Sequence, residues 1–411
     1  MNLRAAIEAG CDAVYFGLRG LNMRAGAENF ALADLKKIAA LCRRNNVRAY
    51  LSLNTIIYER ELTKLRNIIA KARQAQIDAV ICWDFAVIRE ALAQDLPVCL
   101  STQMSVSNSQ SMLFFFNNLG VRRFVLAREC SLGDMKKIKK ALAKSLGEKA
   151  ALVEIEVFAH GAMCVSISGR CFLSQFQYGK SANRGQCIQP CRREYRVVAG
   201  DDQADFSVGT NYILSPKDLC TLPFIDRLID AGVSSLKIEG RNRSPEYVGT
   251  VTAAYRKAVD YYVENRGNRG FRQAFESLKQ GLVDRVTMVY NRGFSSGFFL
   301  GKPVDQWTDT AGSKAPVKKE YVGVVTNFFK KQGVAEIKVE SNGFKQGDEI
   351  LFQGKTTGFF TQTADSIEVD HVKINEAHKG TLVALQTNRR TRPKDTVYVI
   401  KKARQGKAGN T

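Results

Sequence analysis

The chain has 411 residues, of which 45% are hydrophobic and 25% charged, so it can bury a core in two or more domains. Lysine and arginine number 61 against 40 acidic residues, and the resulting net charge of +21 favours a polyanionic partner, most simply RNA, over a merely basic surface. Neither an apolar run of about twenty residues nor a secretory signal is present, which excludes a membrane-spanning protein and predicts a cytoplasmic location with reduced thiols.

Short apolar segments alternate with amphipathic ones over residues 12–240. Seven strands are predicted at 12–18, 47–54, 78–84, 97–103, 122–129, 155–161 and 234–240. Helical stretches such as 33–44, 61–76 and 133–146 separate most of them. This alternation is typical of parallel strands with crossover helices, either in a barrel or in a doubly wound sheet. We favour a TIM-like (β/α) barrel that lacks its first strand, because the chain opens on a helical segment and eight strands would be needed for closure.

A change of pattern predicts a second domain. Ser244 and Pro245 begin a long final helix of the first domain, and residues 301–320 read as a polar linker. Six strands separated by turn residues then follow, without helices, which predicts a small all-β barrel over 321–402. We therefore expect a (β/α) barrel at 1–300, with a cysteine-rich insertion at about 161–232, and a basic tail at 403–411.

Five cysteines gather within and just after one short stretch of the predicted insertion. They are Cys164, Cys171, Cys187, Cys191 and Cys220. Structural zinc normally uses pairs of ligands separated by two to four residues, and only Cys187 and Cys191 come near that spacing. A cysteine peptidase needs a histidine partner, and His160 lacks an evident third group. Wider and more variable spacings suit an iron–sulfur cluster best.

Polar side chains follow the predicted strands, where a parallel barrel places its active site. From these positions we predict catalytic roles for Glu239, Arg241 and His160. Substrate contacts are predicted for five residues at strand ends or in adjoining loops, namely Arg24, Asn54, Gln103, Arg128 and Arg243. Taken one at a time, many of these polar residues could simply cap a helix or lie in a solvated loop. Glu239, Arg241 and Arg243, which end or follow the last apolar strand, are not well explained in that way and favour an anionic or polar ligand.

The segment from Glu156 to Ser174 resembles the signature of the collagenase-like peptidase family, number thirty-two among peptidases of unknown catalytic type. Residues 16–30, 183–195, 214–220 and 235–244 are similar to further segments of that family, as is the predicted C-terminal barrel. The N-terminus departs from the family pattern, because members usually carry an additional strand there.

The resemblance implies oxygen-independent hydroxylation rather than proteolysis. Relatives form 5-hydroxyuridine at the tRNA wobble position, hydroxylate a cytidine of 23S rRNA, or hydroxylate ubiquinone precursors. It also implies a four-iron (4Fe-4S) cluster and prephenate as the source of the hydroxyl group. Cys164, Cys171 and Cys187 should be cluster ligands, with Cys220 as the fourth and Cys191 as the alternative.

The charge of the chain helps to choose among these branches. A quinone-precursor enzyme has no need of a net charge of +21, whereas RNA phosphates favour such a surface, so we expect tRNA, with rRNA and quinone as alternatives. Prephenate is a dicarboxylate, and the planar guanidinium groups of Arg24, Arg241 and Arg243 suit carboxylates. Proteolysis remains an alternative function, although no H-E-x-x-H or G-x-S-x-G motif occurs.

Overall fold

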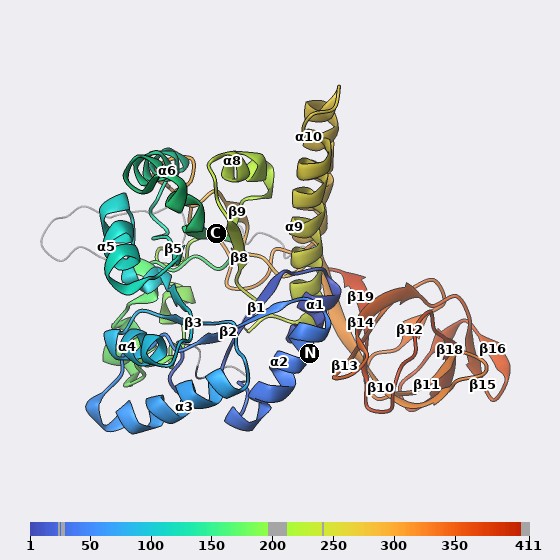
Figure 1. The fold of residues 1–411 in the computed structure, drawn as a ribbon. Helices are drawn as coiled ribbons and strands as arrows, with labels where there is room; N and C mark the ends of the chain where they lie inside the picture. The colour runs from blue at the N-terminus through green and yellow to red at the C-terminus, as the bar shows by residue number, and fades with distance from the viewer. Residues whose placement is uncertain (24, 26–28, 196–211, 241, 404–411) are drawn as a thin grey trace, which may run out of the picture.

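The computed structural model describes residues 1–23, 25, 29–195, 212–240 and 242–403. Two domains are visible (Figure 1): an α/β domain (residues 1–300) and, beside its helices α1 and α9, a β domain (residues 317–403). The mixed α/β class and the antiparallel C-terminal domain confirm the corresponding predictions. Most of the predicted basic tail lies outside the described residues.

Seven parallel strands form the centre of the α/β domain. They are β1 (Ala13–Gly17), β2 (Arg48–Ser52), β3 (Ala79–Cys82), β4 (Val98–Leu100), β5 (Arg123–Val125), β6 (Glu154–Gly161) and β8 (Ser235–Ile238). Each pairs in parallel with the next in this order. All seven lie at the predicted segments, because strands covered by helices are nearly continuous apolar runs that stand out in the sequence.

Helices cover the sheet, and most of them connect successive strands. They are α1 (Asn2–Glu8), α2 (Leu35–Arg44), α3 (Leu62–Gln74), α4 (Phe85–Ala93), α5 (Ser109–Leu119), α6 (Leu132–Leu146), α8 (Ile225–Asp230) and α9 (Pro245–Asn265). Three have a side-chain cap at their start: Asp84 accepts a hydrogen bond from Ala86 N at α4, Asn108 from Ser111 N at α5, and Ser131 from Asp134 N at α6. No described helix combines the length and apolar character needed to cross a bilayer.

The edge strands β1 and β8 face each other without backbone pairing in the described part of the chain. Side chains bridge the gap instead. The Tyr15 hydroxyl donates to the carbonyl of Ile238 at 3.1 Å, and the Lys237 ammonium lies 4.4 Å from the centre of the Tyr15 ring. The seven strands therefore curl far enough for their edges to touch through side chains, as an open barrel would require.

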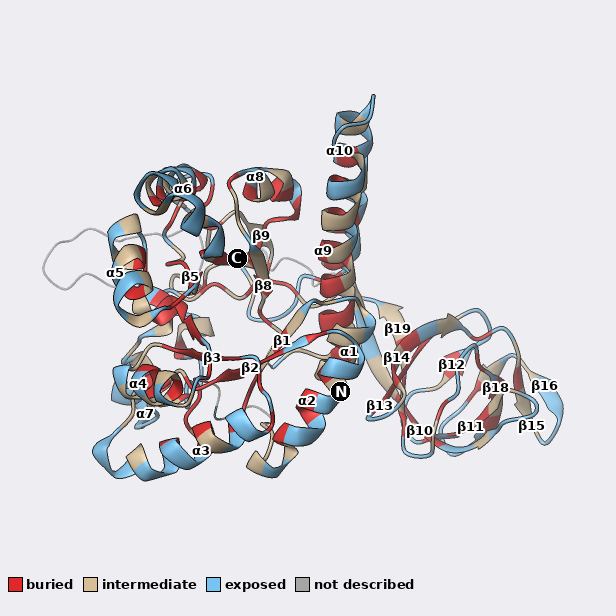
Figure 2. Cartoon of the chain, in the orientation of Figure 1, coloured by how far each residue is buried: buried red, intermediate tan, exposed pale blue. Residues whose placement is uncertain are grey.

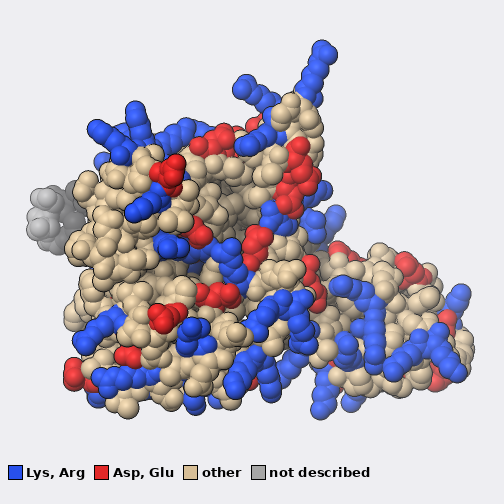
Figure 3. Space-filling view, in the orientation of Figure 1, with Lys and Arg blue, Asp and Glu red and all other residues tan. Residues whose placement is uncertain are grey.

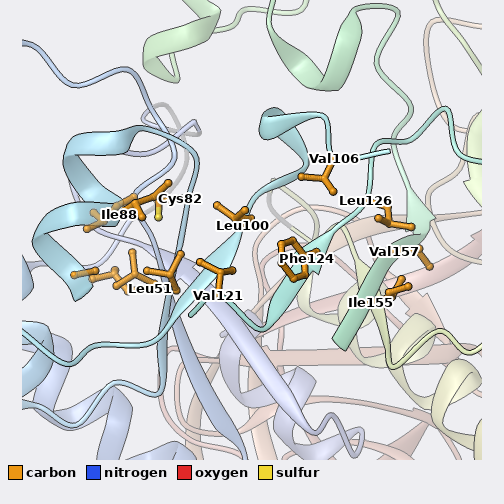
Figure 4. Close-up of a cluster of buried hydrophobic side chains, with 14 of the residues drawn as sticks. Leu51, Cys82, Ile88, Leu100, Val106, Val121, Phe124, Leu126, Ile155 and Val157 are labelled. Carbon is orange, nitrogen blue, oxygen red and sulfur yellow. The ribbon is translucent and has the colours of Figure 1, made fainter. Parts of the chain in front are cut away.

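The core lies between the strands and their helices, where the buried residues are concentrated (Figure 2). Leu51, Leu100, Phe124 and Ile155 come from β2, β4, β5 and β6 and are almost completely buried, with Ile88 of α4 in the same cluster (Figure 4). Each such side chain stabilises the fold by roughly 2 kcal/mol when it leaves water. This packing fixes the strand ends on which the candidate site is built.

Two very short strands extend the sheet beyond the predicted set. β7 (Asp218–Cys220) runs antiparallel to β6, and β9 (Phe294–Ser295) pairs in parallel with β7. Neither is long enough to give a periodic pattern in the sequence. The chain between β6 and β7 contains the cysteine insertion (residues 162–195), whose main helix is α7 (Leu173–Tyr178).

The β domain is an antiparallel sheet that curls around its own apolar core (Figure 1). Its strands are β10 (Val317–Phe329), β11 (Val334–Val339), β12 (Phe344–Lys345), β13 (Glu349–Gly354), β14 (Gly358–Thr363), β15 (Ile367–Val369), β16 (Val372–Ile374), β17 (Glu376–Ala377), β18 (Leu382–Gln386) and β19 (Thr396–Lys402). β10 begins inside the stretch predicted as a linker. Much of that stretch is anchored, since Thr308 is buried and its N–H donates to Ser215 O at 2.8 Å.

The β domain contacts α9 through a position that requires glycine. A Cβ atom on Gly249 would lie 2.4 Å from the Phe359 ring, so the ring occupies the space that any other side chain would take. Nearby, Lys319 Nζ lies 2.7 Å from Glu246 Oε1. The second long helix of this region, α10 (Phe271–Thr287), packs along α9 (Figure 1). These contacts set the walls of the cleft described below.

Candidate functional site

Four of the five clustered cysteines lie together in the cysteine insertion, and all are free thiols. Three of their sulfurs accept a backbone N–H from the residue two positions later. The donors are Ser166 N to Cys164 Sγ at 3.5 Å, Leu173 N to Cys171 Sγ at 3.3 Å and Gln189 N to Cys187 Sγ at 3.4 Å. Hydrogen bonds directed at cysteine sulfur are among the contacts that tune an iron–sulfur cluster.

Cys191 is the fourth thiol of this group. Burial raises the pKa of the Cys191 thiol, the Arg192 guanidinium opposes the rise, and the thiols of Cys164, Cys187 and Cys171 add to it. Cys191 is therefore within electrostatic reach of each of the other three thiols. No three His, Cys, Asp or Glu side chains of the described residues are close enough to form a ready-made metal site. The four thiols, three of which accept a backbone N–H, nevertheless match the four-cysteine donor set of an iron–sulfur cluster.

Arg192 holds this group in place. Its guanidinium donates to Ser215 Oγ at 2.9 Å and Pro216 O at 2.9 Å, and also to the carbonyl of Met163. These bonds join the loop carrying Cys191 to the residue before Cys164 and to the segment that leads into β7. Sequence patterns did not indicate this role, because one arginine among several in a basic stretch reads as surface charge.

Cys220 occupies a different environment. It is buried on β7, its backbone pairs with that of His160, and it belongs to the core formed with α9. Burial raises the pKa of its thiol to about 11, and the groups that oppose this rise are the Leu222 backbone and the Tyr255 hydroxyl. The placement of the two candidates for fourth ligand thus favours Cys191 over Cys220.

A buried ionic group lies at the ends of β6, β7 and β8. Asp218 Oδ1 accepts hydrogen bonds from Arg292 Nη2 at 2.8 Å and Nε at 3.1 Å, and Asp218 Oδ2 lies 3.6 Å from Arg243 Nη2. Burial lowers the pKa of the neighbouring His160 to about 4, with Asp218 opposing and Arg243 reinforcing the shift. Asp218 and Arg292 were not predicted, although Asp218 lies in one of the family-like segments.

Glu239 reaches this region because two strand ends approach closely. Gly161, with φ of +119°, ends β6, and a Cβ atom there would lie 2.7 Å from Glu239 Cβ. Only glycine tolerates both this backbone conformation and this contact. Glu156, the first residue of the family-like signature, is instead structural: it forms a buried ion pair with Lys237, 2.7 Å away.

A cleft of about 1100 Å³ opens between the two domains and reaches the cysteine insertion. Its walls include residues from the insertion, the strand ends, the region of α10 and the β domain, among them Cys187, Ile188, Gln189, Glu239, Arg243, Arg285, Tyr290, Arg292, Phe359 and Arg389. Lys and Arg side chains crowd the β domain and the adjoining edge of the α/β domain (Figure 3). One thiol, several arginines and two aromatic rings thus share one opening.

The other predicted site residues are placed elsewhere or cannot be described. Asn54 Nδ2 donates to Gln103 Oε1 at 3.0 Å, and Gln103 Nε2 returns a bond of 3.0 Å to Asn54 O. Arg128 Nη1 donates to Ala162 O at 3.0 Å, at the start of the insertion. These three residues brace the strand ends and do not line the interdomain cleft. Arg24 and Arg241 lie outside the described residues.

Comparison with known proteins gives consistent matches along the chain. The model of Peptidase family U32 matches residues 1–309. A protein named Collagenase from Porphyromonas gingivalis is 40% identical over 97% of this chain and 94% of its own length. The tRNA hydroxylation protein P1 of Bacillus subtilis is 30% identical, over 89% of this chain and 84% of its own. The 23S rRNA 5-hydroxycytidine synthase of Escherichia coli is 31% identical, over 82% of this chain and 54% of its own.

Proposed function

We propose that this chain, which belongs to Peptidase family U32, hydroxylates RNA, and that it forms 5-hydroxyuridine at the wobble position of tRNA. Relatives named for tRNA and rRNA hydroxylation match most of its length and make RNA the first substrate class to test. A cytoplasmic location, where tRNA is modified, is part of the same proposal.

The observation that carries this proposal is the position of the four thiols. Cys187 lines the interdomain cleft, and Cys191 interacts electrostatically with Cys187, Cys164 and Cys171. Cys164, Cys171, Cys187 and Cys191 would hold a 4Fe-4S cluster, which supplies one-electron transfer when bound. A catalyst that acts on a base must bring that base to its reactive group, and an unpaired anticodon loop can present a uridine to an open cleft.

The arginines of the cleft support a carboxylate co-substrate. Arg243 lies over the Tyr290 ring at 4.2 Å and faces Asp218 at 3.6 Å, beyond hydrogen-bonding distance, so its guanidinium is available to a second anion. Arg292 is committed to Asp218 and holds it in place. We propose that Arg243 binds a carboxylate of prephenate, the expected hydroxyl donor, and that Glu239 on the opposite strand end orients the substrates.

Proteolysis is the competing function, because the Porphyromonas relative carries the name Collagenase. A cysteine peptidase needs a thiolate beside a basic histidine. His160 is buried, with a pKa of about 4, and Cys220, which pairs with it across the strands, is buried and protonated at neutral pH. His371 and His378 lie in the β domain. A histidine-assisted nucleophile has no support in this arrangement.

Nucleoside analysis tests the proposal. Total tRNA from a host lacking this gene, complemented with either wild type or Cys191→Ala, is digested and examined by mass spectrometry. We expect 5-hydroxyuridine derivatives with the wild type and their loss with Cys191→Ala. If hydroxycytidine in 23S rRNA responds instead, the substrate is rRNA. If no nucleoside responds but a ubiquinone precursor accumulates, the substrate is the quinone precursor.

A further inference from the structure

The cysteine insertion carries an exposed apolar surface that the site described above does not use. Phe176 is 85% exposed and Phe172 is 62% exposed, and both lie on or next to the short helix α7. Their ring centres are 5.9 Å apart, with the ring planes at 52°. Three more exposed apolar residues belong to the same insertion: Ile167, Tyr178 and Ile188. Large side chains left in water at one place on a protein mark a binding surface more often than chance exposure.

Basic side chains are interleaved with these rings. Arg170, Lys180 and Arg193 are exposed, and none forms an ion pair with a carboxylate of the described residues. The Arg193 guanidinium lies 5.3 Å from the centre of the Tyr178 ring, and that of Arg170 lies 5.8 Å from the centre of the Trp83 ring. Exposed rings among unpaired cations are the combination that single-stranded nucleic acid requires, because bases stack on rings while phosphates meet cations.

This surface is continuous with the cleft. Ile188 belongs to the exposed apolar surface and also lines the cleft next to Cys187. The N–H of Ile188 donates to Ser174 Oγ at 3.3 Å, which ties this loop to α7, the helix that carries Phe176. The loop that lines the cleft is therefore attached to the helix that carries Phe176.

We propose that Phe172 and Phe176 form a stacking platform for unpaired RNA bases that flank the nucleotide entering the cleft, with Arg170, Lys180 and Arg193 meeting the adjoining phosphates. This inference rests on the proposed function for the identity of the target, but its RNA-binding step can be tested without turnover. An acidic protein docking on the same surface is the competing occupant. RNA is favoured by the guanidinium–ring contacts and by the net charge of +21.

Binding of a fluorescein-labelled, single-stranded RNA heptamer is measured by anisotropy for wild type, Phe172→Ala, Phe176→Ala and Phe176→Trp. The matched control is Phe114→Ala, which removes a 57% exposed phenylalanine from α5. Because stacking of one base on an aromatic ring is worth roughly tenfold in affinity, each alanine variant of the platform should weaken binding by about that factor. Phe176→Trp should bind at least as tightly as wild type, and Phe114→Ala should match it.

A second readout separates stacking from electrostatics. The weakening caused by Phe176→Ala should be the same at low and high salt, because every phosphate-binding cation is still present. Wild-type affinity in both alanine variants would overturn the platform even if nucleoside analysis shows hydroxylation. Conversely, weakened binding in these variants would uphold it even if no hydroxylated nucleoside is found. Unchanged RNA binding with slower reduction by an acidic redox protein would assign the surface to that protein instead.

Discussion

Asp218 and Arg292 form an ion pair in the interior, in which Nε and Nη2 of Arg292 both donate to Oδ1 of Asp218. Both side chains are almost fully buried. Asp218 also faces Arg243, so its carboxylate balances more than one guanidinium. Asp218→Asn should therefore lower the free energy of unfolding by about 3 kcal/mol, because it leaves buried cations without their counter-charge. Urea unfolding measures this. The exposed pair Lys345–Glu376 provides the control, since Glu376→Gln should change stability by less than about 1 kcal/mol. Equal effects of the two substitutions would contradict the account.

His160 makes stability depend on pH. Its pKa is about 4 in the folded protein, below the ordinary value of 6.5, so between these values the unfolded chain binds a proton that the folded protein does not. Stability should then be full above about pH 6.5 and fall as the pH drops towards 4, by up to about 1.4 kcal/mol per pH unit. Urea unfolding at pH 7.5 and pH 5 measures the slope. His160→Gln should flatten it, and a slope unchanged by that substitution would show that His160 does not cause it.

The two candidates for the fourth cluster ligand give opposite expectations. Cys191→Ala should lose most of the bound iron and sulfide, because it removes one of four neighbouring thiols. Cys220→Ala should keep them, because Cys220 lies in the core beside Tyr255. Iron and sulfide are measured per chain after anaerobic purification. Iron retained by Cys191→Ala and absent from Cys220→Ala would reverse the assignment, and a zinc-only protein would remove the cluster altogether.

Arg285 of α10 and Arg389 of the β domain both line the cleft, and neither pairs with a carboxylate in the described part of the chain. Charge reversal at either residue should weaken tRNA binding and reduce the salt dependence of the binding constant, by about one unit of slope for each phosphate that the variant no longer binds. Lys136→Glu on α6, which is not part of the cleft, is the matched control. Titrations at several salt concentrations decide the matter. A Lys136 variant as impaired as the cleft variants would show that the effect is general charge.

Sequence patterns predicted the fold well where the signal is local. Apolar runs located all seven parallel strands, and turn residues located the antiparallel domain. The strands β7, β9, β12, β16 and β17 were missed because two or three residues carry no period, and β14 was missed as well. The predicted linker at 301–320 was longer than the structure allows. Polar residues such as Thr308 can be buried against a segment that is distant in the sequence, and a polar composition does not reveal this.

The candidate site was predicted less completely, for a similar reason. Cysteine spacing indicated the thiol group, and strand ends indicated Glu239, His160 and Arg243. Arg192, Asp218 and Arg292 act through contacts that only the folded chain creates. The choice between Cys191 and Cys220 depended on the burial of the second one on β7, and spacing does not determine that.

The most direct test of the central claim is hydroxylation by the purified protein. Anaerobically prepared, iron-loaded protein is incubated with unmodified tRNA, with and without prephenate, and the nucleosides are examined by mass spectrometry. We predict uridine with one added oxygen atom, dependent on prephenate and absent with Cys191→Ala. Unmodified tRNA under all these conditions, together with cleavage of gelatin by an iron-free preparation, would contradict the account.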